Sequence, residues 1–532
     1  MALRKLSRLV VAALVSIALL VGVAPTPAQA AVTKTSSAEK KRVDKVKTKV
    51  TWTSTCAANT KCGKITLPLD YDKPKGTKVT VKLARYRSPS QVTRLGAIFV
   101  NFGGPGSAAI AYVKSAPAYF SADILKYFDI IGVDPRGTNT SAKVKCYSTT
   151  AKQTKGLAGM TGVAIPTSAQ VSAYKASAKS LAKACSSTGK SKASAMSTAE
   201  VARDMDVIRR VLGYSKMNYL GFSYGTYLGQ VYASMFPDRI RTMALDGFIN
   251  PVSWRGTSST KNTPITLRIG AATGSWNALV AGLNACKAAG SKCPIKQDPL
   301  WAFQTVAARL QARTYYVAGF GNLTYSQFIS YTVTNLRYYD SPERIAKIVA
   351  GLLVVTDPAS SASQISSAAA TIAQPLQTVR LATSTTVDPA YYAVMCTDST
   401  NAKNQSTYVN AIALANNSAP HFGSYWGWQA MPCATAYWTA KDEDRYTKAF
   451  AAKTAYPVLA IGTTYDPVTP VSGARNVTAT LTNAVFVENN GYGHLSYFNS
   501  TCIRNKVNAY FISRTLPSWG TTCSNEHPVF TK

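Results

Sequence analysis

Apolar residues gather in short runs separated by Gly, Asp or Pro, and these runs predict strands. The segment from Val79 to Tyr86 alternates apolar and polar positions, as a half-buried strand does. Ala97 to Asn101 is almost wholly apolar, which is typical of a strand buried on both faces. Similar runs follow at 128–133, 217–222, 242–246 and 457–461. We expect a sheet that begins near Ile65.

The spacing between these runs predicts helices. From Thr198 to Leu212, apolar side chains recur on one helical face and charged ones on the other. Strands that alternate with helices form parallel β-α-β units, because a parallel pair needs a long crossover connection. The sequence therefore predicts the α/β class, with a mostly parallel sheet covered by helices.

The pattern changes in the middle of the chain and then returns. Residues 250–455 are Ala-, Leu- and Ser-rich with many Tyr and Trp, and the strand pattern resumes only at Tyr456. A chain of 532 residues also exceeds the length of about 300 at which one core stops growing. We expect a core in two parts, 51–249 and 456–532, with a largely helical cap domain inserted at 250–455.

The N-terminus carries the features of a cleavable signal peptide. Three cations precede the apolar run Leu9 to Val23, and Ala28-Gln-Ala30 follows as a small-residue cleavage site. We therefore assign 1–30 to a signal peptide and expect export. Residues 31–50 are polar and basic without an apolar period, which predicts a flexible leader or pro-segment.

The formal charge of +35 becomes +32 once the three signal-peptide cations are removed. Outside Lys34 to Lys49 the basic residues are scattered, and no nucleic-acid-binding motif is present. We expect a solvated basic surface and no nucleic-acid partner. Weak adhesion to an anionic cell envelope is the next alternative, and the oligomeric state stays open.

Ten cysteines in the mature chain indicate disulfides and an oxidising compartment. The spacing of cysteines and histidines matches no usual zinc site, so we expect neither a metal nor another cofactor. Sequence does not fix the connectivity. Nearest-neighbour pairing joins Cys56 with Cys62, Cys146 with Cys185, Cys286 with Cys293, Cys396 with Cys433, and Cys502 with Cys523.

A candidate nucleophile lies in Gly221-Phe-Ser-Tyr-Gly225. The motif directly follows a predicted strand and precedes a helix-compatible run, Thr226 to Phe236, which is the setting of a nucleophile elbow. Glycines flank the serine because the tight turn leaves no room for side chains. An ordinary loop is the alternative. In the elbow interpretation Ser223 is the nucleophile.

A second glycine-rich loop, Asn101 to Ser107, follows the strand 97–101. Acyl transfer needs N–H donors that bind the oxyanion of the transition state. A loop that directly follows a central strand can supply one of them. Our candidates are the N–H groups of Gly104 and Tyr224, because Pro105 has none. A simple glycine turn between strand and helix is the alternative.

Only three histidines exist, which narrows the choice of general base. His494 fits best, because it lies in a glycine-rich loop after the apolar run 484–487, whereas His421 lies within the predicted cap and His527 near the terminus. Asp466 follows the strand 457–461 and precedes the histidine, as the order nucleophile, acid, base requires. An Asx-type turn before Pro467 is the alternative for Asp466.

Together with Val133-Asp-Pro-Arg-Gly-Thr, Leu245-Asp-Gly and the segment from Cys502 to Cys523, these motifs resemble the secreted tripeptidyl aminopeptidases, relatives of the proline iminopeptidases. The resemblance covers about residues 50–525. It implies an α/β-hydrolase fold with Ser223, Asp466 and His494 as catalytic triad. Phe102 departs from the His-Gly-Gly-Pro-Gly of proline iminopeptidases, which favours tripeptidyl over single-proline release.

The resemblance implies removal of short peptides, often tripeptides, from substrates with free N-termini. Such an enzyme needs a carboxylate for the substrate α-ammonium, and the sequence does not choose among the candidates. They are Asp340, Glu343, Asp398 and the cluster Asp442-Glu443-Asp444. A secreted carboxylesterase or lipase is the second hypothesis, and a catalytically inactive, basic envelope-binding protein is the third.

Overall fold

A ten-stranded sheet forms the centre of the computed structural model, which describes residues 31–160, 167–383 and 387–531. The predicted signal peptide lies outside the described residues. The strands lie in the order β1-β2-β3-β5-β4-β6-β7-β10-β11-β12. Pairs up to β3·β5 are antiparallel, and all later pairs are parallel. The bounds are β1 Val50–Ala57, β2 Thr60–Pro68, β3 Lys78–Tyr86, β4 Gly96–Asn101, β5 Phe128–Asp134, β6 Met217–Phe222, β7 Ile240–Asp246, β10 Val458–Tyr465, β11 Ala484–Tyr492 and β12 Thr522–Ser524.

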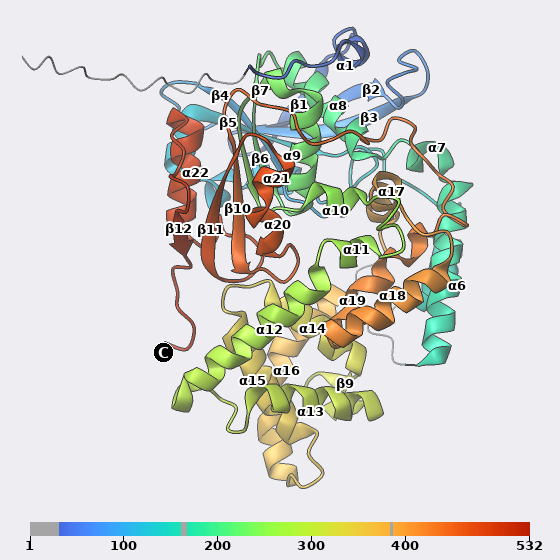
Figure 1. The fold of residues 1–532 in the computed structure, drawn as a ribbon, viewed down its shortest axis with the longest axis vertical. Helices are drawn as coiled ribbons and strands as arrows, with labels where there is room; N and C mark the ends of the chain where they lie inside the picture. Colours follow the sequence, from blue (N-terminus) through green and yellow to red (C-terminus); the bar gives the residue numbers. More distant parts are fainter. Residues whose placement is uncertain (1–30, 161–166, 384–386, 532) are drawn as a thin grey trace, which may run out of the picture. The chain divides into compact units, whose positions relative to one another are not determined.

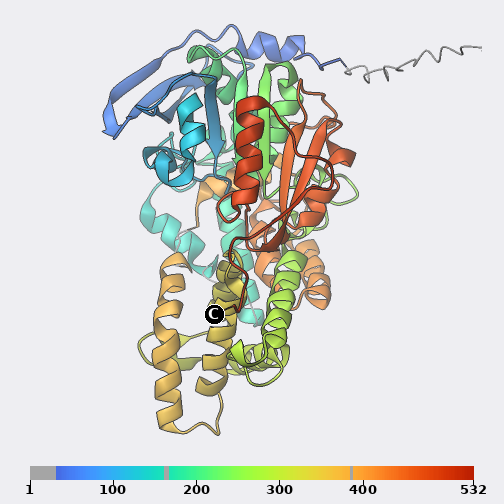
Figure 2. The same ribbon diagram turned by 90° about the vertical axis from the view of Figure 1, so that its left-hand side faces the viewer.

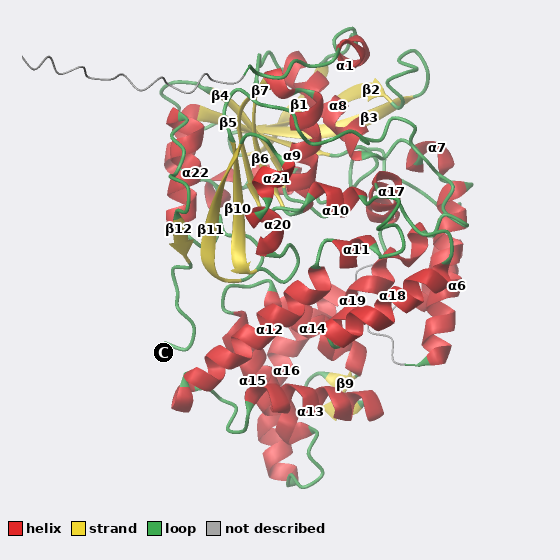
Figure 3. Ribbon diagram, in the orientation of Figure 1, coloured by secondary structure: helices red, strands yellow, loops and turns green. Residues whose placement is uncertain are grey.

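Helices cover both faces of this sheet (Figure 3). Neighbouring strand residues such as Ile98 and Phe99 belong to different hydrophobic clusters, because successive side chains point to opposite faces. The helices of the α/β part are α2 Ile110–Lys114, α3 Ala116–Tyr119, α4 Ala122–Tyr127, α5 Thr150–Leu157, α6 Ser168–Ser186, α7 Lys190–Ala193, α8 Thr198–Val211, α9 Tyr224–Met235, α10 Pro251–Arg255, α20 Val471–Arg475, α21 Val477–Thr480 and α22 Thr501–Ser513. Short 3-10 helices lie at η1 Ala158–Met160, η2 Pro237–Arg239, η3 Gly290–Lys292 and η4 Trp428–Cys433.

The predicted α/β class with a mostly parallel sheet is confirmed. Strand β6 has the predicted bounds, and α8 covers the predicted amphipathic segment. The antiparallel hairpin β1–β2 was not predicted, since its many Thr and Lys residues hide the apolar alternation. Strand β12 was missed because it is only three residues long.

A third hydrophobic cluster forms the core of the cap. Its helices lie beyond the ends of β10 and β11 (Figure 1). The helices between β7 and β10, after α10, are α11 Ile265–Arg268, α12 Ala271–Ala288, α13 Pro299–Ala312, α14 Tyr325–Leu336, α15 Ser341–Val355, α16 Ala362–Thr383, α17 Pro389–Asp398, α18 Gln405–Ser418 and α19 Phe422–Gly427, with a hairpin of β8 Tyr315–Val317 and β9 Gly321–Leu323.

The segment predicted as one cap domain, 250–455, divides between two cores. Side chains from 271 to 376 build most of the separate cap cluster. Helix α17 and the buried side chains from Trp428 to Phe450 instead join the cluster on one face of the sheet. Part of the insertion therefore belongs structurally to the α/β core, and composition could not separate the two parts because both are apolar and Ala-rich.

The expectation of a flexible leader at 31–50 is corrected by the structure. Residues Ser37–Val43 form helix α1, and Val43 is fully buried. Glu39 forms an ion pair with Arg203 of α8 at 2.9 Å. Arg42 forms ion pairs with Asp72 at 2.6 Å and Asp444 at 2.7 Å. Charge pairing and the buried side chains of Val43 and Val46 hold a segment whose sequence lacks an apolar period.

A buried arginine explains the Asp-Pro-Arg-Gly motif. The Arg136 guanidinium is 1% exposed and donates to Asp204 at 2.6 and 2.8 Å and to Glu200 at 2.8 Å. It also donates to the carbonyl oxygens of Pro68 and Leu69. The motif therefore ties the β2–β3 connection to helix α8.

Five disulfides join the cysteines in the predicted nearest-neighbour pairs. After β12 the chain leaves the sheet and runs along the cap (Figure 2). Phe530 is buried in the cap cluster, and its N–H donates to Glu343 of α15 at 2.5 Å. The last residues thus connect the edge of the sheet to the cap.

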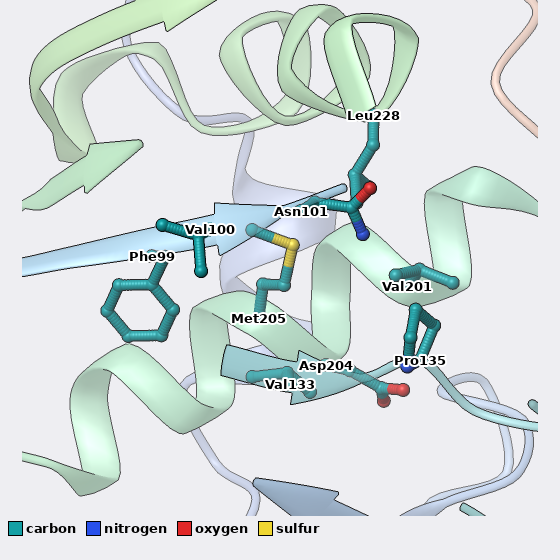
Figure 4. Close-up of a pocket in the computed structure, with 9 residues that line it drawn as sticks. All are labelled: Phe99, Val100, Asn101, Val133, Pro135, Val201, Asp204, Met205 and Leu228. Carbon is teal, nitrogen blue, oxygen red and sulfur yellow. The ribbon is translucent and has the colours of Figure 1, made fainter. Parts of the chain in front are cut away.

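A small cavity of about 10 Å³ lies between β4, β5, α8 and α9 (Figure 4). Phe99, Met205 and Leu228 are among its lining residues. A volume of this size holds about one water, so this cavity is not a substrate site.

In the described part of the chain, no helix is long and apolar enough to cross a membrane.

Candidate active site

Ser223 lies on a sharp turn between β6 and α9, as the elbow motif predicts. Its backbone has φ 53° and ψ −123°, which is uncommon for a residue with a side chain. A Cβ added at Gly221 would lie 2.5 Å from the Gly225 carbonyl oxygen, so a side chain does not fit there. The Ser223 N–H donates to the Asp246 carbonyl oxygen at 2.9 Å. These contacts hold the hydroxyl at the carboxyl end of the parallel strands.

Asp466 and His494 form a hydrogen-bonded pair at the same end of the sheet. His494 Nδ1 lies 2.8 Å from Asp466 Oδ2 and 3.0 Å from Oδ1. Because an ionised carboxylate only accepts, Nδ1 carries the proton and Nε2 is left as the base. The Asp466 carboxylate also accepts the N–H groups of Val468 and Thr469, both at 2.8 Å. The Asp466 carboxylate therefore forms a turn and also contacts the imidazole, in a position to orient it.

The loop after β4 packs against the elbow. The Asn101 side chain accepts the Gly103 N–H at 2.9 Å and shapes the turn. A Cβ added at Gly103 would lie 2.9 Å from the Ser223 Cβ, so the two loops are in contact. Within the described residues, the N–H groups of Gly104 and Tyr224 donate to no protein acceptor. Both candidates for the oxyanion hole are thus free to donate.

Phe102, the departure from the proline iminopeptidase motif, lies in an aromatic stack. Its ring lies 3.8 Å from the Tyr112 ring and 5.3 Å from the Phe222 ring, centroid to centroid. Phe222 in turn lies 5.0 Å from Phe498. The stack joins the loop after β4, the strand before Ser223 and the chain after His494. A histidine would insert a polar group into this apolar contact.

The cap contacts both loops that carry the Asp–His pair. The His494 N–H donates to the Arg337 carbonyl oxygen at 2.9 Å, in the turn between α14 and α15. Ser275 of α12 donates to the Pro467 carbonyl oxygen at 2.7 Å and accepts Trp426 Nε1–H at 2.9 Å. The sequence did not indicate these contacts. Two of the three acceptors are the backbone carbonyls of Arg337 and Pro467, and every residue type carries such a group.

The two other histidines lie away from this pair. His421 begins α19 within the cap, and its Nδ1 lies 2.7 Å from Tyr325 Oη. Burial lowers the pKa of His421 to about 4, so its imidazole stays neutral. His527 packs against Tyr339, with ring centroids 5.7 Å apart.

Two of the carboxylates considered for the substrate α-ammonium, Asp398 and Glu343, are engaged elsewhere. Asp398 is 3% exposed and accepts from Thr198 N at 2.7 Å, Thr198 Oγ1 at 2.6 Å and Trp254 Nε1 at 3.2 Å. Burial raises the pKa of Asp398 to about 7. Glu343 accepts the Phe530 N–H. Both carboxylates serve internal contacts.

The remaining candidates lie at two places, Asp340 at one and the cluster 442–444 at the other. Asp340 lies on the α14–α15 turn, three residues after Arg337, and accepts from Arg344 at 2.6 Å with a quarter of its side chain exposed. Glu443 lines a cavity of about 350 Å³ beside Asp442 and Asp444. Of the two, only Asp340 belongs to a turn that contacts the His494 loop.

No group of three or more His, Cys, Asp or Glu in the described ranges is arranged to hold a metal ion.

This geometry defines the class of the protein, a serine hydrolase of the α/β-hydrolase fold. Comparison with known families agrees. Residues 96–257 match the model of the alpha/beta hydrolase fold family, and residues 419–523 match the family described as TAP-like protein. The chain therefore has the α/β-hydrolase fold, and its residues 419–523 are similar to the TAP-like family.

Curated relatives match most of the chain. The tripeptidyl aminopeptidase of Streptomyces coelicolor is 28% identical over 477 residues, which cover 87% of this chain and 83% of the relative. The serine protease Hip1 of Mycobacterium tuberculosis is 26% identical over 478 residues, with 87% of each chain covered. Carboxylesterase B of Mycobacterium tuberculosis is 28% identical over 482 residues, covering 87% of this chain and 86% of the relative.

Proposed function

We propose that this protein is a secreted serine exopeptidase that releases short peptides, in particular tripeptides, from free N-termini. The observation that carries the proposal is the buried Asp466 carboxylate bonded to His494 Nδ1 at 2.8 Å, at the same end of the sheet as the elbow serine. The similarity to a tripeptidyl aminopeptidase over 87% of the chain supports the substrate class. Five disulfides and the predicted signal peptide support export.

The proposed reaction follows from the geometry. His494 Nε2 takes the proton of Ser223 as its hydroxyl attacks the substrate carbonyl. The N–H groups of Gly104 and Tyr224 stabilise the oxyanion. His494 then protonates the leaving amine, and water enters to release the acyl product by the reverse proton transfers. Asp466 stabilises the imidazolium in both halves of the reaction.

For the substrate α-ammonium we propose Asp340. It projects from the turn whose Arg337 carbonyl binds the His494 N–H, and its pairing with Arg344 leaves acceptor capacity on the carboxylate. Asp340→Asn should raise KM about tenfold for peptides with a free N-terminus and leave ester hydrolysis unchanged. Asp357→Asn is the matched control, because Asp357 is a cap carboxylate paired with Arg309 at 3.4 Å. Equal KM values for the two variants would rule out Asp340.

A secreted carboxylesterase is the second candidate, because carboxylesterase B is as similar as the aminopeptidase. Anilides of Ala-Ala-Pro and Ala-Ala-Phe, each with a free and a blocked N-terminus, should be compared with short acyl esters. We expect the highest kcat/KM for the free tripeptide anilides and a loss of about 10- to 100-fold on blocking, since the blocked substrate cannot form the charged hydrogen bond of its α-ammonium. An esterase would have the highest kcat/KM for the esters, and blocking the N-terminus would not change its kcat/KM for the anilides.

The third hypothesis, an inactive envelope-binding protein, is tested with a fluorophosphonate probe. We expect the wild type to be labelled and Ser223→Ala to be unlabelled. A folded wild-type protein that takes no label, together with salt-sensitive adhesion to anionic envelopes, would favour the binding protein.

A further inference from the structure

The loops that carry Ser223, Asp466 and His494 meet at two residues, Asp246, which ends strand β7, and Gly247, which follows it. The Asp246 carbonyl oxygen accepts the Ser223 N–H at 2.9 Å, and the Gly247 N–H donates to the Ile461 carbonyl oxygen of β10 at 3.2 Å. The end of β7 is therefore bonded through its backbone both to the nucleophile elbow and to the strand that leads to Asp466.

The Asp246 side chain reaches the third loop. Its carboxylate is fully buried and accepts the Ser496 N–H at 2.9 and 3.1 Å and the Tyr497 N–H at 2.8 Å. These two donors directly follow the loop of His494. A carboxylate that accepts two backbone N–H groups is a strong, charge-assisted anchor. Asp246 thus holds the histidine loop with its side chain and the serine with its main chain.

Gly247 brings the loops into van der Waals contact. Its φ is +70°, and an added Cβ would lie 3.3 Å from His494 Cε1 and 3.1 Å from Thr469 Oγ1. Thr469 donates to Asp466 Oδ2 at 2.9 Å. The imidazole and the loop of its acid partner therefore rest against the backbone at Gly247.

The buried carboxylate also supplies charge near the imidazole. Burial has the largest effect and raises the pKa of Asp246 to about 6. The hydrogen bonds from the Tyr497 and Ser496 N–H groups and the interaction with His494 lower this pKa, whereas the interaction with Asp466 raises it. His494 and Asp466 are the titratable side chains that act on it. Above pH 6 the ionised carboxylate therefore attracts the imidazolium formed during catalysis.

We propose that Asp246 is a positioning residue that fixes Ser223 and His494 relative to each other. Its buried carboxylate also stabilises the imidazolium, in addition to the carboxylate of Asp466. The proposal rests on the proposed triad of Ser223, Asp466 and His494. It assigns a catalytic-site role to the Leu-Asp-Gly motif at the end of β7, and that role does not require Asp246 to touch the substrate.

The test is the Asp246→Asn variant. The amide is isosteric but has no charge, and it places an NH2 group against the Ser496 and Tyr497 N–H groups. The rate of fluorophosphonate labelling at pH 7.5 should fall about 10- to 100-fold, because small misplacements of reacting groups cost this much. The acid limb of the rate profile should move to lower pH by roughly half a unit or more, since the imidazolium loses a nearby anion.

Asp129→Asn is the matched control. Asp129 is an equally buried carboxylate at the start of β5, bonded to Arg87 at 2.7 and 2.9 Å and remote in sequence from the three loops. It should lose stability and keep the wild-type labelling rate and pH profile. An Asp246→Asn protein with the same rate and profile as Asp129→Asn would overturn the inference while leaving the triad intact. An unlabelled wild type would instead overturn the proposed function, and this inference with it.

Amide hydrogen exchange of wild-type residues 495–498 provides a second test that needs no variant. Acceptance by the carboxylate should keep the Ser496 and Tyr497 amides protected at pH 7.5 and less protected below pH 6, where Asp246 takes up a proton. Exchange at the rate of an open loop at pH 7.5 would overturn the role of Asp246 even if the Asp246→Asn protein does not fold.

Discussion

At Ser223 the backbone adopts a conformation that costs a non-glycine residue roughly 1 to 3 kcal/mol. Contacts on every side offset that cost. The serine N–H is held by Asp246, its carbonyl oxygen accepts from Thr226 N and Oγ1, and Gly103 packs against its Cβ. The pair of Asp466 and His494 is fixed in the same way, by N–H groups that keep the carboxylate oriented.

Asp466→Asn separates the structural role of this residue from its catalytic role. The amide oxygen still accepts from Val468 and Thr469, so the melting temperature should stay within a few degrees of wild type. The amide no longer stabilises the imidazolium, and kcat should fall about 10⁴-fold. Asp388→Asn, which changes another turn-capping aspartate bonded to Ala390 N, should leave kcat unaltered. A kcat loss under tenfold in Asp466→Asn would remove Asp466 from the triad.

Helix α1 shows how an element forms without an apolar pattern of its own. Seven residues are too few for a stable isolated helix. Its stability comes from docking, through the pairs of Glu39 with Arg203 and of Arg42 with Asp72 and Asp444. Burial raises the pKa of Glu39, but the hydrogen bonds and charges of Arg203 and Arg42 outweigh it and leave the pKa below its ordinary value.

Glu39→Gln should therefore reduce stability in a pH-dependent manner. Because the folded pKa of Glu39 lies below 4.5, the ion pair contributes fully above pH 4.5 and is lost as the pH falls through the folded value. We expect a loss of about 1 to 3 kcal/mol in urea unfolding at pH 7 and a smaller one at a pH below 4.5. Lys40→Gln, on the exposed face of the same helix, should change stability by less than about 0.5 kcal/mol. An equal loss at both pH values would contradict the ion-pair account.

Between the sheet and the cap, several contacts bear directly on the active site. Arg337 and Ser275 bond the loops of His494 and Asp466 from the cap side. The C-terminal segment lies beside the cap (Figure 2). It adds a further link, since Phe530 is buried in the cap core and Lys292 donates to the Thr531 carbonyl oxygen. The cap is thus part of the framework that holds the catalytic residues.

Phe530→Ala tests this coupling. The lost side chain should cost about 3 kcal/mol in urea unfolding, as buried phenylalanines do. The labelling rate at Ser223 should fall as well, because the cap that braces the histidine loop is loosened. Trp519→Ala, which changes an aromatic residue of the same terminal segment that is 68% exposed, should alter neither quantity appreciably. A stability loss with an unchanged labelling rate would show that the cap does not brace the site.

The sequence predicted best the features that depend on neighbours along the chain. Strand β6, the elbow at Ser223 and helix α8 follow from periodicity and from glycine sterics within a few residues. The order nucleophile, acid, histidine then identified Asp466 and His494, which the structure brings together at 2.8 Å. The leader helix was missed because its partners, Arg203 and Asp444 among them, lie far away in the sequence, and β12 was missed because it is only three residues long.

What the sequence by itself determined was the class of fold, the elbow serine and the acid and histidine that accompany it, because those depend on local pattern and chain order. Only the tertiary structure decided the rest. It places the Asp246 carboxylate under a loop 250 residues later and turns Asp398 and Glu343 inward, to Thr198 and Phe530. Such partners are chosen by packing across the whole molecule, where a buried carboxylate bonds to the donors that the fold brings to it.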